Sequence, residues 1–367
     1  MKNIITDIAK KIGIDVIGFT DVVDYSYLHE LLVSRKNKGC NSEFEEQVII
    51  KRLDARNILP GCKSIIAIAL PYAEGYKKSH APNKGLLSVV SYGEDYHNKV
   101  KKLLENLAGE MKRNFNFEYV ACVDTTPLVD REICKNAGIG YYGKNSLLIN
   151  ENYGSFINLG YLLTDIEIQC EIMQAVDICN DCNICIKSCP NHAILKDGII
   201  DASRCVSGLT QTKRYIPVEY RNKMKNQIYG CDMCQLVCPK NKQILEKKSN
   251  EDYKSLELNL EELLKISNAE FAQKYGNLSG SWRGKNVWKR NALISIANLK
   301  LVSLFHAVEN ELDNPSDMIK IYGCWTLMEL DSKKASDILN KRYDYENDII
   351  KCEILKLLED YHDSRNM

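Results

Sequence analysis

The chain has 367 residues, with 49 Lys and Arg against 49 Asp and Glu, so its formal net charge is zero. A hydrophobic content of 45% excludes a disordered chain, and the length exceeds one compact core, so we expect two or three domains. The neutral total gives no global sign of a nucleic-acid partner, although a local basic patch can lie within it.

The sequence predicts a cytoplasmic protein with no membrane partner. No stretch approaches the ~20 apolar residues that cross a bilayer, and the longest apolar run, 64–70, has the length of a strand. Asp7 interrupts what would be the apolar part of a signal peptide, and no small-residue cleavage site follows. In a reducing compartment, a chain with 15 cysteines is expected to bind metal rather than to form disulfides.

Strand-like and helix-like patterns alternate along the first part of the chain. A helix at 4–12 precedes strands that begin at Asp15 and Ser64, and a helix over 95–112 precedes a strand that ends at Asp124. A helix at 130–136 and a hairpin-like pair at 145–150 and 155–165 follow. This alternation predicts an α/β domain over residues 1–169.

Eight of the 15 cysteines lie in one window that begins at Cys179 and ends at Cys238. The first run is Cys179-x2-Cys182-x2-Cys185-x3-Cys189-Pro190, the second is Cys231-x2-Cys234-x3-Cys238-Pro239, and Cys205 stands between them. This spacing is typical of two [4Fe-4S] clusters, in which the last cysteine of a run ligates the other cluster. Structural zinc sites usually use two separated pairs of ligands, so zinc is the weaker alternative.

The crossover rule divides the eight thiolates into two sets of four, and the window corresponds to a second domain over residues 170–245. One predicted set is Cys179, Cys182, Cys185 and Cys238; the other is Cys189, Cys205, Cys231 and Cys234. The cysteine spacing does not identify the acceptor of the electrons that the clusters would carry.

A charged segment at 246–255 is the predicted linker to a third, all-α domain over residues 246–367. Helix-sized apolar periodicities at 258–275, 287–299, 318–330 and 348–361 favour antiparallel helix pairs stacked as an α-solenoid.

Two short motifs give weaker signals. Residues 138–145, GIGYYGKN, satisfy G-x-G-x-x-G, but a helix precedes them and a strand follows, which is the wrong order for a phosphate loop. Asp95-Tyr96-His97 begins like a cobalt-binding D-x-H-x-x-G sequence, but Val100 stands where Gly is required. We therefore interpret His97 as a helix-start residue.

Asp124 closes an apolar strand and is followed by Thr125, Thr126 and Pro127. Its chemistry alone fits an ordinary turn or cap. Beside a cofactor cavity it could instead act as a proton donor if burial raised its pKa.

Two basic stretches carry the local charge signal. Residues 273–290 contain five Lys or Arg and no acid, and they hold two of the three Trp; residues 209–226 contain five Lys or Arg against Glu219 alone. Cations interleaved with aromatic rings suit phosphate contacts and base stacking. A solvated helix face is the alternative.

Taken in order, six strings resemble the epoxyqueuosine reductase family over nearly the whole chain. They are KRLDARNILPGCKSIIAIALPY from Lys51, SYGEDYH from Ser91, VDTTPLVDREICKNAGIGYYGKN from Val123, the two-part cysteine motif, RCVSGLTQTK from Arg204 and SGSWRGKNVWKRNA from Ser279. The chain departs from the family pattern at Asn191-His192, at Lys240 and at Tyr161, a position that is often acidic.

The resemblance implies a cobalamin-binding α/β domain, a ferredoxin-like domain with two [4Fe-4S] clusters and a HEAT-like helical domain that binds tRNA. It implies reduction of epoxyqueuosine to queuosine at the anticodon wobble position. Electrons would come from a donor protein of the flavodoxin or ferredoxin type, pass singly through the clusters, and reduce base-off cobalamin from cob(II)alamin to cob(I)alamin. A monomer is expected.

The resemblance also assigns residues. Asp124 would be the proton donor, and the cobalamin site would include Arg52, Ser88, Asp124, Leu148, Leu159 and Ser207. The tRNA contacts would be Lys213, Ser281, Trp282, Arg283, Gly284, Lys285, Arg290 and Asn291.

Two alternatives stay open at this stage. A cluster-bearing electron carrier would need neither cobalamin nor Asp124. A cobalamin-dependent reductive dehalogenase would share the metal inventory but has no reason to carry the basic, Trp-containing stretch.

Overall fold

The computed structural model describes residues 1–22, 24–73, 76, 83–170, 176, 178–195, 198–247 and 257–366. The chain forms two compact units. The first comprises Met1–Lys77, Val89–Gly208 and Asp232–Lys254, and the second comprises Lys78–Ser88, Leu209–Cys231 and Ser255–Met367. The predicted 170–245 segment is thus divided between the units, and most of the predicted linker at 246–255 lies outside the described residues.

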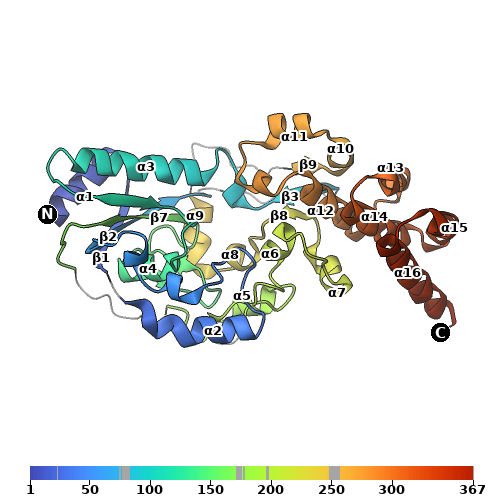
Figure 1. Cartoon of the computed structure of the whole chain (residues 1–367), viewed down its shortest axis with the longest axis horizontal. Coiled ribbons are helices and arrows are strands. Elements are labelled where there is room, and N and C mark those ends of the chain that lie inside the picture. Colours follow the sequence, from blue (N-terminus) through green and yellow to red (C-terminus); the bar gives the residue numbers. More distant parts are fainter. Residues whose placement is uncertain are drawn as a thin grey trace. The chain divides into compact units, whose positions relative to one another are not determined.

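The first unit is built on a four-stranded sheet in the order β1-β2-β7-β4 (Figure 1). The strands are β1 (Val16–Asp21), β2 (Ser64–Pro71), β7 (Ile157–Thr164) and β4 (Tyr119–Cys122). All three pairings are antiparallel. The alternation of helices and strands therefore predicted a domain of both kinds correctly, but none of the pairings in this sheet is of the parallel kind that such alternation usually indicates.

Helices cover both faces of this sheet (Figure 1). The side chains of β2 alternate: Ile66 and Ile68 pack in one core with α1 (Lys2–Lys11) and α3 (Tyr96–Met111), while Ile65 and Ala67 pack in the other with α4 (Asp130–Asn136). A strand with a period of two and both faces apolar is buried on both sides, which explains the uninterrupted apolar run.

Gly160 lets α3 approach β7 closely. A Cβ at this position would lie 2.4 Å from Cγ1 of Val100 and 3.1 Å from Cδ1 of Leu104, both on α3. Such distances are too short for a side chain, so glycine is required for this packing. The contact positions α3, whose first residues are Tyr96 and His97.

Shorter elements complete the first unit. They are η1 (Tyr25–Leu28), α2 (His29–Asn37), η2 (Ile49–Arg52), η3 (Ala55–Asn57), η4 (Val89–Ser91), β5 (Tyr141–Tyr142), β6 (Leu148–Ile149), α5 (Ile184–Ser188), α8 (Met233–Leu236), η7 (Pro239–Asn241) and α9 (Lys242–Glu246), while α6 (Val206–Gln211) continues into the second unit. The predicted hairpin is wrong, because β6 pairs with β5 and β7 pairs with β2 and β4.

The second unit combines a small sheet, β8-β3-β9, with a series of helices. Its strands are β3 (Lys84–Leu87), β8 (Gln227–Tyr229) and β9 (Glu257–Asn259). Its helices are α7 (Val218–Arg221), η6 (Asn222–Met224), α10 (Leu260–Lys265), α11 (Asn268–Tyr275), η8 (Ser279–Arg283), α12 (Lys285–Asn298), η9 (Val302–Leu304), α13 (Phe305–Asn310), η10 (Glu311–Asp313), α14 (Asp317–Leu330), α15 (Ser332–Arg342), η11 (Tyr343–Tyr345) and α16 (Asp348–Asn366).

Three of the four predicted C-terminal helices correspond to α12, α14 and α16. The predicted helix at 258–275 is instead interrupted, because Ser267 caps α11 and forms a capping box with Glu270. Helix α14 packs against both α12 and α16, as stacked helices require. None of the described helices is long and apolar enough to span a bilayer.

Candidate active site and cluster-binding segment

Asp124 lies just past the end of β4, at an edge of the sheet that no strand covers. The register pairs Cys122 with Tyr161, so continuing it would bring Asp124 level with Leu159. In the described structure β4 ends at Cys122, while β7 continues past Leu159 to Ile157 and is paired there only with β2. The chain therefore leaves the sheet just before Asp124, and Leu159 lies on the stretch of β7 that β4 leaves uncovered.

The backbone of Asp124 is strained. Its φ is 33°, in the left-handed region that residues with a side chain rarely adopt. Such a conformation costs about 1–3 kcal/mol and persists where surrounding contacts hold it, often at functional sites.

Two side chains from the start of α3 hold the Asp124 carboxylate. The His97 Nε2 lies 2.8 Å from Oδ1 of Asp124, and the Tyr96 hydroxyl donates a hydrogen bond to Oδ2. The other ring nitrogen of His97 lies 2.6 Å from Oδ1 of Asp95, the residue that caps α3. His97 is the second residue of α3, as predicted, and it is also held between two carboxylates, which the sequence did not predict.

This arrangement sets the protonation states of the pair. The hydrogen bond to Asp124 raises the pKa of His97 to about 9, against an opposing effect of burial. Burial raises the pKa of Asp124, but the hydrogen bonds from His97 and Tyr96 outweigh it, so the pKa is lowered overall. The rise in the pKa of Asp124 that a lone proton donor needs does not occur, and the proton lies on His97.

A second carboxyl near Asp124, that of Asp130, has a raised pKa instead of a lowered one. Burial raises the pKa of Asp130 to about 7, and the charge of Asp124 adds to the rise. The Tyr161 hydroxyl donates to Oδ1 of Asp130 at 2.6 Å and lies 2.8 Å from Oγ1 of Thr126. Tyr161, one of the departures from the family pattern, thus connects the Asp124 loop to α4.

The predicted cobalamin contacts fit a large polar ligand in one respect. Nε of Arg52 is buried and has no hydrogen-bond partner among the described residues, while its Nη1 is paired with Glu45 at 2.7 Å. A buried donor without a partner is costly, so a ligand acceptor at this position is favoured. Leu148 lies in β6, Ser207 in α6, and Ser88 is buried in the second unit.

The first predicted set of cysteines is brought together in the first unit. Cys185 lies within electrostatic range of Cys179, Cys182 and Cys238, and Cys238 also faces Cys179 and Cys182. Four thiols so close repel one another as thiolates, so a positively charged metal cluster would stabilise their ionised forms. Cys238 is 53 residues beyond Cys185 in the printed sequence, as the crossover rule predicts.

Part of the second predicted set is also gathered. Cys205 faces Cys189, and its sulfur accepts hydrogen bonds from the backbone of Ser207 and Gly208. Amide donors to the sulfurs tune the potential of a cluster. Cys231 and Cys234 flank the start of α8, and Cys231 belongs to the second unit.

A buried polar network ties the second cysteine run to the loop before β7. The Asn241 amide accepts from the backbone N–H of Ser155 at 2.7 Å and donates to Oγ of Ser155 and to the carbonyl of Gln235. Oγ of Ser155 donates to Gln235 at 3.0 Å. Because every member is bonded, the network rigidifies the segment that carries Cys234 and Cys238.

The GIGYYGKN loop supports the cysteines, a role that its pattern did not predict. The backbone N–H of Lys144 lies 3.4 Å from Sγ of Cys179, and Nζ of Lys144 donates to the carbonyl of Asn180 at 2.5 Å. The prediction that this loop does not open a helix is confirmed, since β5 and β6 lie on either side of Lys144.

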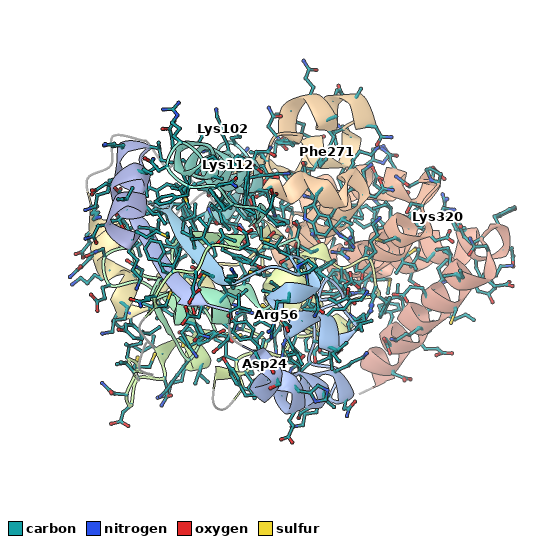
Figure 2. All side chains as sticks on the ribbon, turned by 60° about the vertical axis from the view of Figure 1, so that its left-hand side comes forward. Asp24, Arg56, Lys102, Lys112, Phe271 and Lys320 are labelled. Carbon is teal, nitrogen blue, oxygen red and sulfur yellow. The ribbon has the colours of Figure 1, made fainter. Side chains whose placement is uncertain are left out.

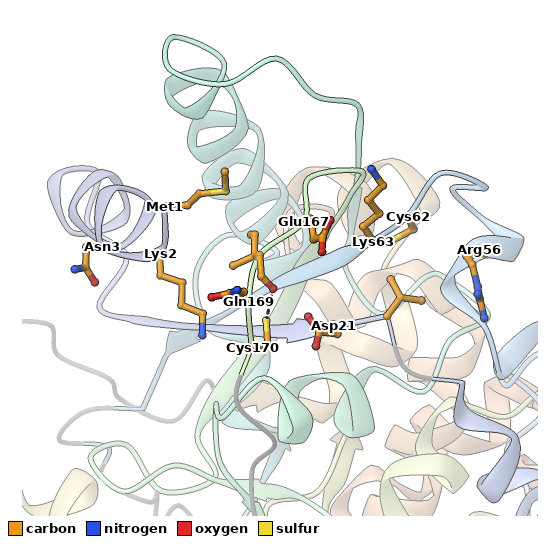
Figure 3. Close-up of a pocket in the computed structure, with 12 residues that line it drawn as sticks. Met1, Lys2, Asn3, Asp21, Arg56, Cys62, Lys63, Glu167, Gln169 and Cys170 are labelled. Carbon is orange, nitrogen blue, oxygen red and sulfur yellow. Dashed lines mark hydrogen bonds between the residues drawn. The ribbon is translucent and has the colours of Figure 1, made fainter.

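The described residues contain no group of three or more His, Cys, Asp or Glu that could hold a single metal ion. One large hollow lies apart from the sites described above. A hollow of about 1310 Å³ beside β1 and β2 is lined by Lys2, Asp21, Cys62 and Cys170 among others, and it includes no predicted site residue (Figure 3).

In the second unit, two of the predicted tRNA contacts are buried. Arg290 donates to the carbonyls of Leu209 and Thr212, at 2.9 and 2.5 Å. Asn291 donates to the carbonyls of Thr210 and Ile228, at 2.8 and 2.7 Å. Both side chains are fully enclosed, so the structure gives them no surface for an RNA contact.

Other predicted contacts are accessible. Trp282 is 55% exposed, the Arg283 guanidinium lies 4.7 Å from its ring, and Nε of Arg283 donates to the carbonyl of Gln211. Lys213 is exposed, and Ser281, Gly284 and Lys285 are partly exposed. Arg290, Asn291 and Arg283 thus brace the 209–212 backbone, which leads directly to Lys213.

Comparison with known proteins identifies close relatives. Residues 178–241 match the family described as 4Fe-4S double cluster binding domain, and residues 52–125 match Epoxyqueuosine reductase QueG. The chain is 36% identical to the epoxyqueuosine reductase of Staphylococcus aureus, over 98% of this chain and 96% of that protein.

Two solved structures have the same fold. One is a crystal structure of epoxyqueuosine reductase with a tRNA-Tyr epoxyqueuosine-modified stem loop, with a TM-score of 0.91, 34% identity and 98% of both chains covered. The other is from Bacillus subtilis, described with its aspartate catalytic loop swung out of the active site, with a TM-score of 0.90, 34% identity and the same coverage.

Proposed function

Because this chain belongs to the epoxyqueuosine reductase family, we propose that it reduces epoxyqueuosine to queuosine in the wobble position of tRNA, using cobalamin reduced through two [4Fe-4S] clusters. The observation that carries the proposal is the strained Asp124 at the open edge of β7, paired with His97. Loss of the epoxide oxygen as water requires protons, and this pair of side chains can supply one.

The proposed cofactor residues come from the family resemblance, and the uncovered edge of β7 at Leu159 supports one of them. Arg52, Asp124, Leu148, Leu159, Ser207 and Ser88 would hold the cobalamin. When bound, cobalamin would supply the low-potential electrons for loss of the epoxide oxygen. The unpaired Nε of Arg52 supports its place in this set.

Protons are the contribution of the chain itself. Loss of the epoxide oxygen as water consumes two electrons and two protons. His97 retains its proton up to a pKa of about 9, and its Nε2 lies 2.8 Å from Asp124. We propose that His97 passes this proton to Asp124, which donates it to the departing oxygen. Tyr96 keeps the carboxylate aligned during the transfer.

The swung-out loop described for the Bacillus subtilis enzyme supports this scheme. In the present chain Asp124 is held by α3 and is 42% exposed at its side chain, so it can leave and return to the site if its contacts with Tyr96 and His97 open. The strain at its φ angle of 33° lowers the cost of such a movement.

The RNA would contact the second unit. The exposed Trp282 offers a ring for base stacking, and Lys213, Arg283 and Lys285 offer cations for phosphate. Arg290 and Asn291 would act indirectly, because they hold the backbone that presents Lys213. A reductive dehalogenase has no use for this surface. The chain is proposed to act as a monomer with a low-potential donor protein.

The deciding experiment is an anaerobic assay. The protein is supplied with cobalamin, a low-potential reductant and epoxyqueuosine tRNA, and queuosine is measured by mass spectrometry. Asp124→Asn should lower turnover by ~10²-fold or more, because a general acid is lost. The iron content should stay at about eight atoms per chain. Bound cobalamin is measured in the same samples, because Asp124 also belongs to the proposed cofactor site.

Two results would count against the proposal. Full iron content without any queuosine would favour an electron carrier that performs no chemistry. Undiminished turnover in Asp124→Asn would remove Asp124 from the proton path while leaving the family assignment intact. Glu118→Gln serves as a matched control, because Glu118 is a carboxylate just before β4 with no part in the site.

A further inference from the structure

We propose that a groove beside the first set of cysteines is the docking site for the protein that delivers electrons, and that this partner is an acidic one-electron carrier. The groove has a volume of about 350 Å³ and runs along α2, the start of α4 and the loop at 142–146. We name it the α2 groove. The inference rests on the proposed function, since it presumes that these cysteines hold a cluster.

The first step concerns distance to the redox centre. Cys179 itself lines the α2 groove, together with Gly143 and Lys144. Cys179 lies within electrostatic range of Cys185 and Cys238, so the groove borders the proposed cluster site. A carrier seated in the groove would therefore contact a cluster ligand directly. Electron transfer between proteins requires such close approach.

The second step concerns charge. The charged residues that line the groove are Arg35, Arg131, Glu132 and Lys144. Glu132 is buried and paired with Lys135, and Arg35 is paired with Glu45 at 3.0 Å. Arg131 and Lys144 form no ion pair with any described residue; their side chains bind the carbonyls of Ser146 and Asn180. The groove thus presents uncompensated positive charge, which complements an acidic partner.

The third step concerns the apolar rim. Leu28, Leu31 and Leu32 of η1 and α2 line the groove, and Leu31 is 43% exposed. Tyr27 is 57% exposed and donates a hydrogen bond to Glu132 in the groove. A small apolar patch ringed by cations is what a weak, short-lived electron-transfer contact needs, because such interfaces bury less than about 1,200 Å².

The test uses the full chain with its clusters and needs neither tRNA nor cobalamin. The oxidised protein is mixed with reduced flavodoxin at low ionic strength, and the bleaching of the cluster absorbance is followed by stopped flow. Arg131→Glu and Leu31→Glu should each slow this reduction ~10-fold or more, because electrostatic steering and the apolar contact are lost. Reduction by dithionite should proceed at the wild-type rate, with iron content unchanged.

The control variant is Lys102→Glu, which makes the same change of charge on α3, across the sheet from α2 (Figures 1 and 2). It should leave both rates unchanged. Lys144 is not a suitable variant, because its ammonium group also holds the Asn180 carbonyl beside Cys179. Added salt should slow reduction by flavodoxin in the wild type and have less effect in Arg131→Glu.

Three outcomes would overturn the docking site. Equal slowing with flavodoxin and dithionite would mean that the variants damage the cluster. Equal slowing in Lys102→Glu would mean that only the net charge matters. A smaller mass of Leu31→Glu in light scattering would show that the groove binds a second copy of the chain. Failure of queuosine formation with a normal flavodoxin response would instead reject the proposed function alone.

Discussion

At the scale of single residues, the candidate site depends on one carboxylate with two partners. Asp124 was expected from the motif, but its protonation state follows from His97 and Tyr96, which lie on α3 and are brought to it by the fold. The Tyr96 and Asp124 positions are 28 residues apart, and no local pattern predicts their contact. The only sequence signals for this contact were the Asp95-Tyr96-His97 string at the start of a predicted helix and the aspartate that closes a predicted strand.

In the proposed mechanism, the pH dependence of the reaction follows from the pKa of His97. Its pKa is raised from 6.5 to about 9 by the hydrogen bond to Asp124, so the imidazolium persists through neutral pH. We expect wild-type turnover to be maintained up to about pH 9 and to fall above it. In His97→Gln the alkaline loss should disappear and turnover should be low throughout. Anaerobic pH profiles of queuosine formation test this.

The same pKa shift predicts a change in stability. Because the pKa in the folded state is raised above the unfolded value of 6.5, the stabilisation is fully present below pH 6.5 and is lost as pH rises through about 9. Thermal unfolding of the wild type should weaken over that interval, and that of His97→Gln should not. Equal pH dependence in both proteins would contradict the ion pair as its source.

Tyr161 shows how a departure from the family pattern is accommodated. At a position that is often acidic, the phenol donates to Asp130 and lies 2.8 Å from Oγ1 of Thr126, and its side chain is fully buried. Asp130 has a pKa of about 7, so it is partly protonated near neutrality. A tyrosine at this position therefore gives Asp130 a hydrogen-bond donor and adds no unpaired buried charge.

At the scale of elements, the site is created by strands of unequal length. β4 ends at Cys122 while β7 continues to Ile157, so the backbone edge near Leu159 is open where Asp124 turns away. The hydrophobic pattern located both strands, but their antiparallel order decides which residues of β7 are left uncovered. The predicted hairpin failed for the same reason, since strand partners are a tertiary choice.

The fit of α3 on β7 can be tested at Gly160. Gly160→Ala would place a methyl group 2.4 Å from Cγ1 of Val100, and overpacking of this kind costs about 1–3 kcal/mol. We expect a lower unfolding temperature and lower turnover, because α3 carries Tyr96 and His97.

Gly160→Ala combined with Val100→Ala is the matched control. The shorter side chain removes the contact, so the double variant should be more stable than the sum of the single effects predicts, by about 0.5–3 kcal/mol. Denaturant titration of the four proteins measures this coupling. Simple additivity would show that the close contact does not limit the packing.

At the scale of the whole molecule, the chain forms two units, and each unit is built from three separate segments of the sequence. The 209–231 segment lies between cysteines in the sequence but belongs to the helical unit, where Arg290 and Asn291 bind its backbone. The order of motifs along the sequence predicted three consecutive domains. It gave no sign that the buried Arg290 would take carbonyl partners from the 209–212 segment. The folded chain supplies these partners from this segment.

The proposed RNA-binding surface of the second unit gives the last prediction. Trp282→Ala should weaken binding of a tRNA anticodon stem loop by about 1–3 kcal/mol, the value of base stacking on an aromatic ring, with no change in the salt dependence. Lys213→Ala should instead reduce the slope of log K against log salt by about one, because one phosphate contact is lost. Fluorescence anisotropy at several salt concentrations separates the two.

Tyr345→Ala is the control for this surface, since Tyr345 is 89% exposed in η11 but lies outside both basic stretches. It should bind RNA like the wild type. If all three variants bound RNA with wild-type affinity and salt dependence, the basic stretches would be ordinary solvated surface.

The sequence alone determined the chemistry that depends on local spacing: the two cysteine runs, the apolar strands, the basic stretches and the family strings. These follow from residue types at short intervals, which local structure transmits directly. Only the tertiary structure decided the rest. It brought His97 to Asp124 and Lys144 to Cys179, and it enclosed Arg290. Protonation and burial depend on neighbours that are distant in sequence, and only folding chooses those neighbours.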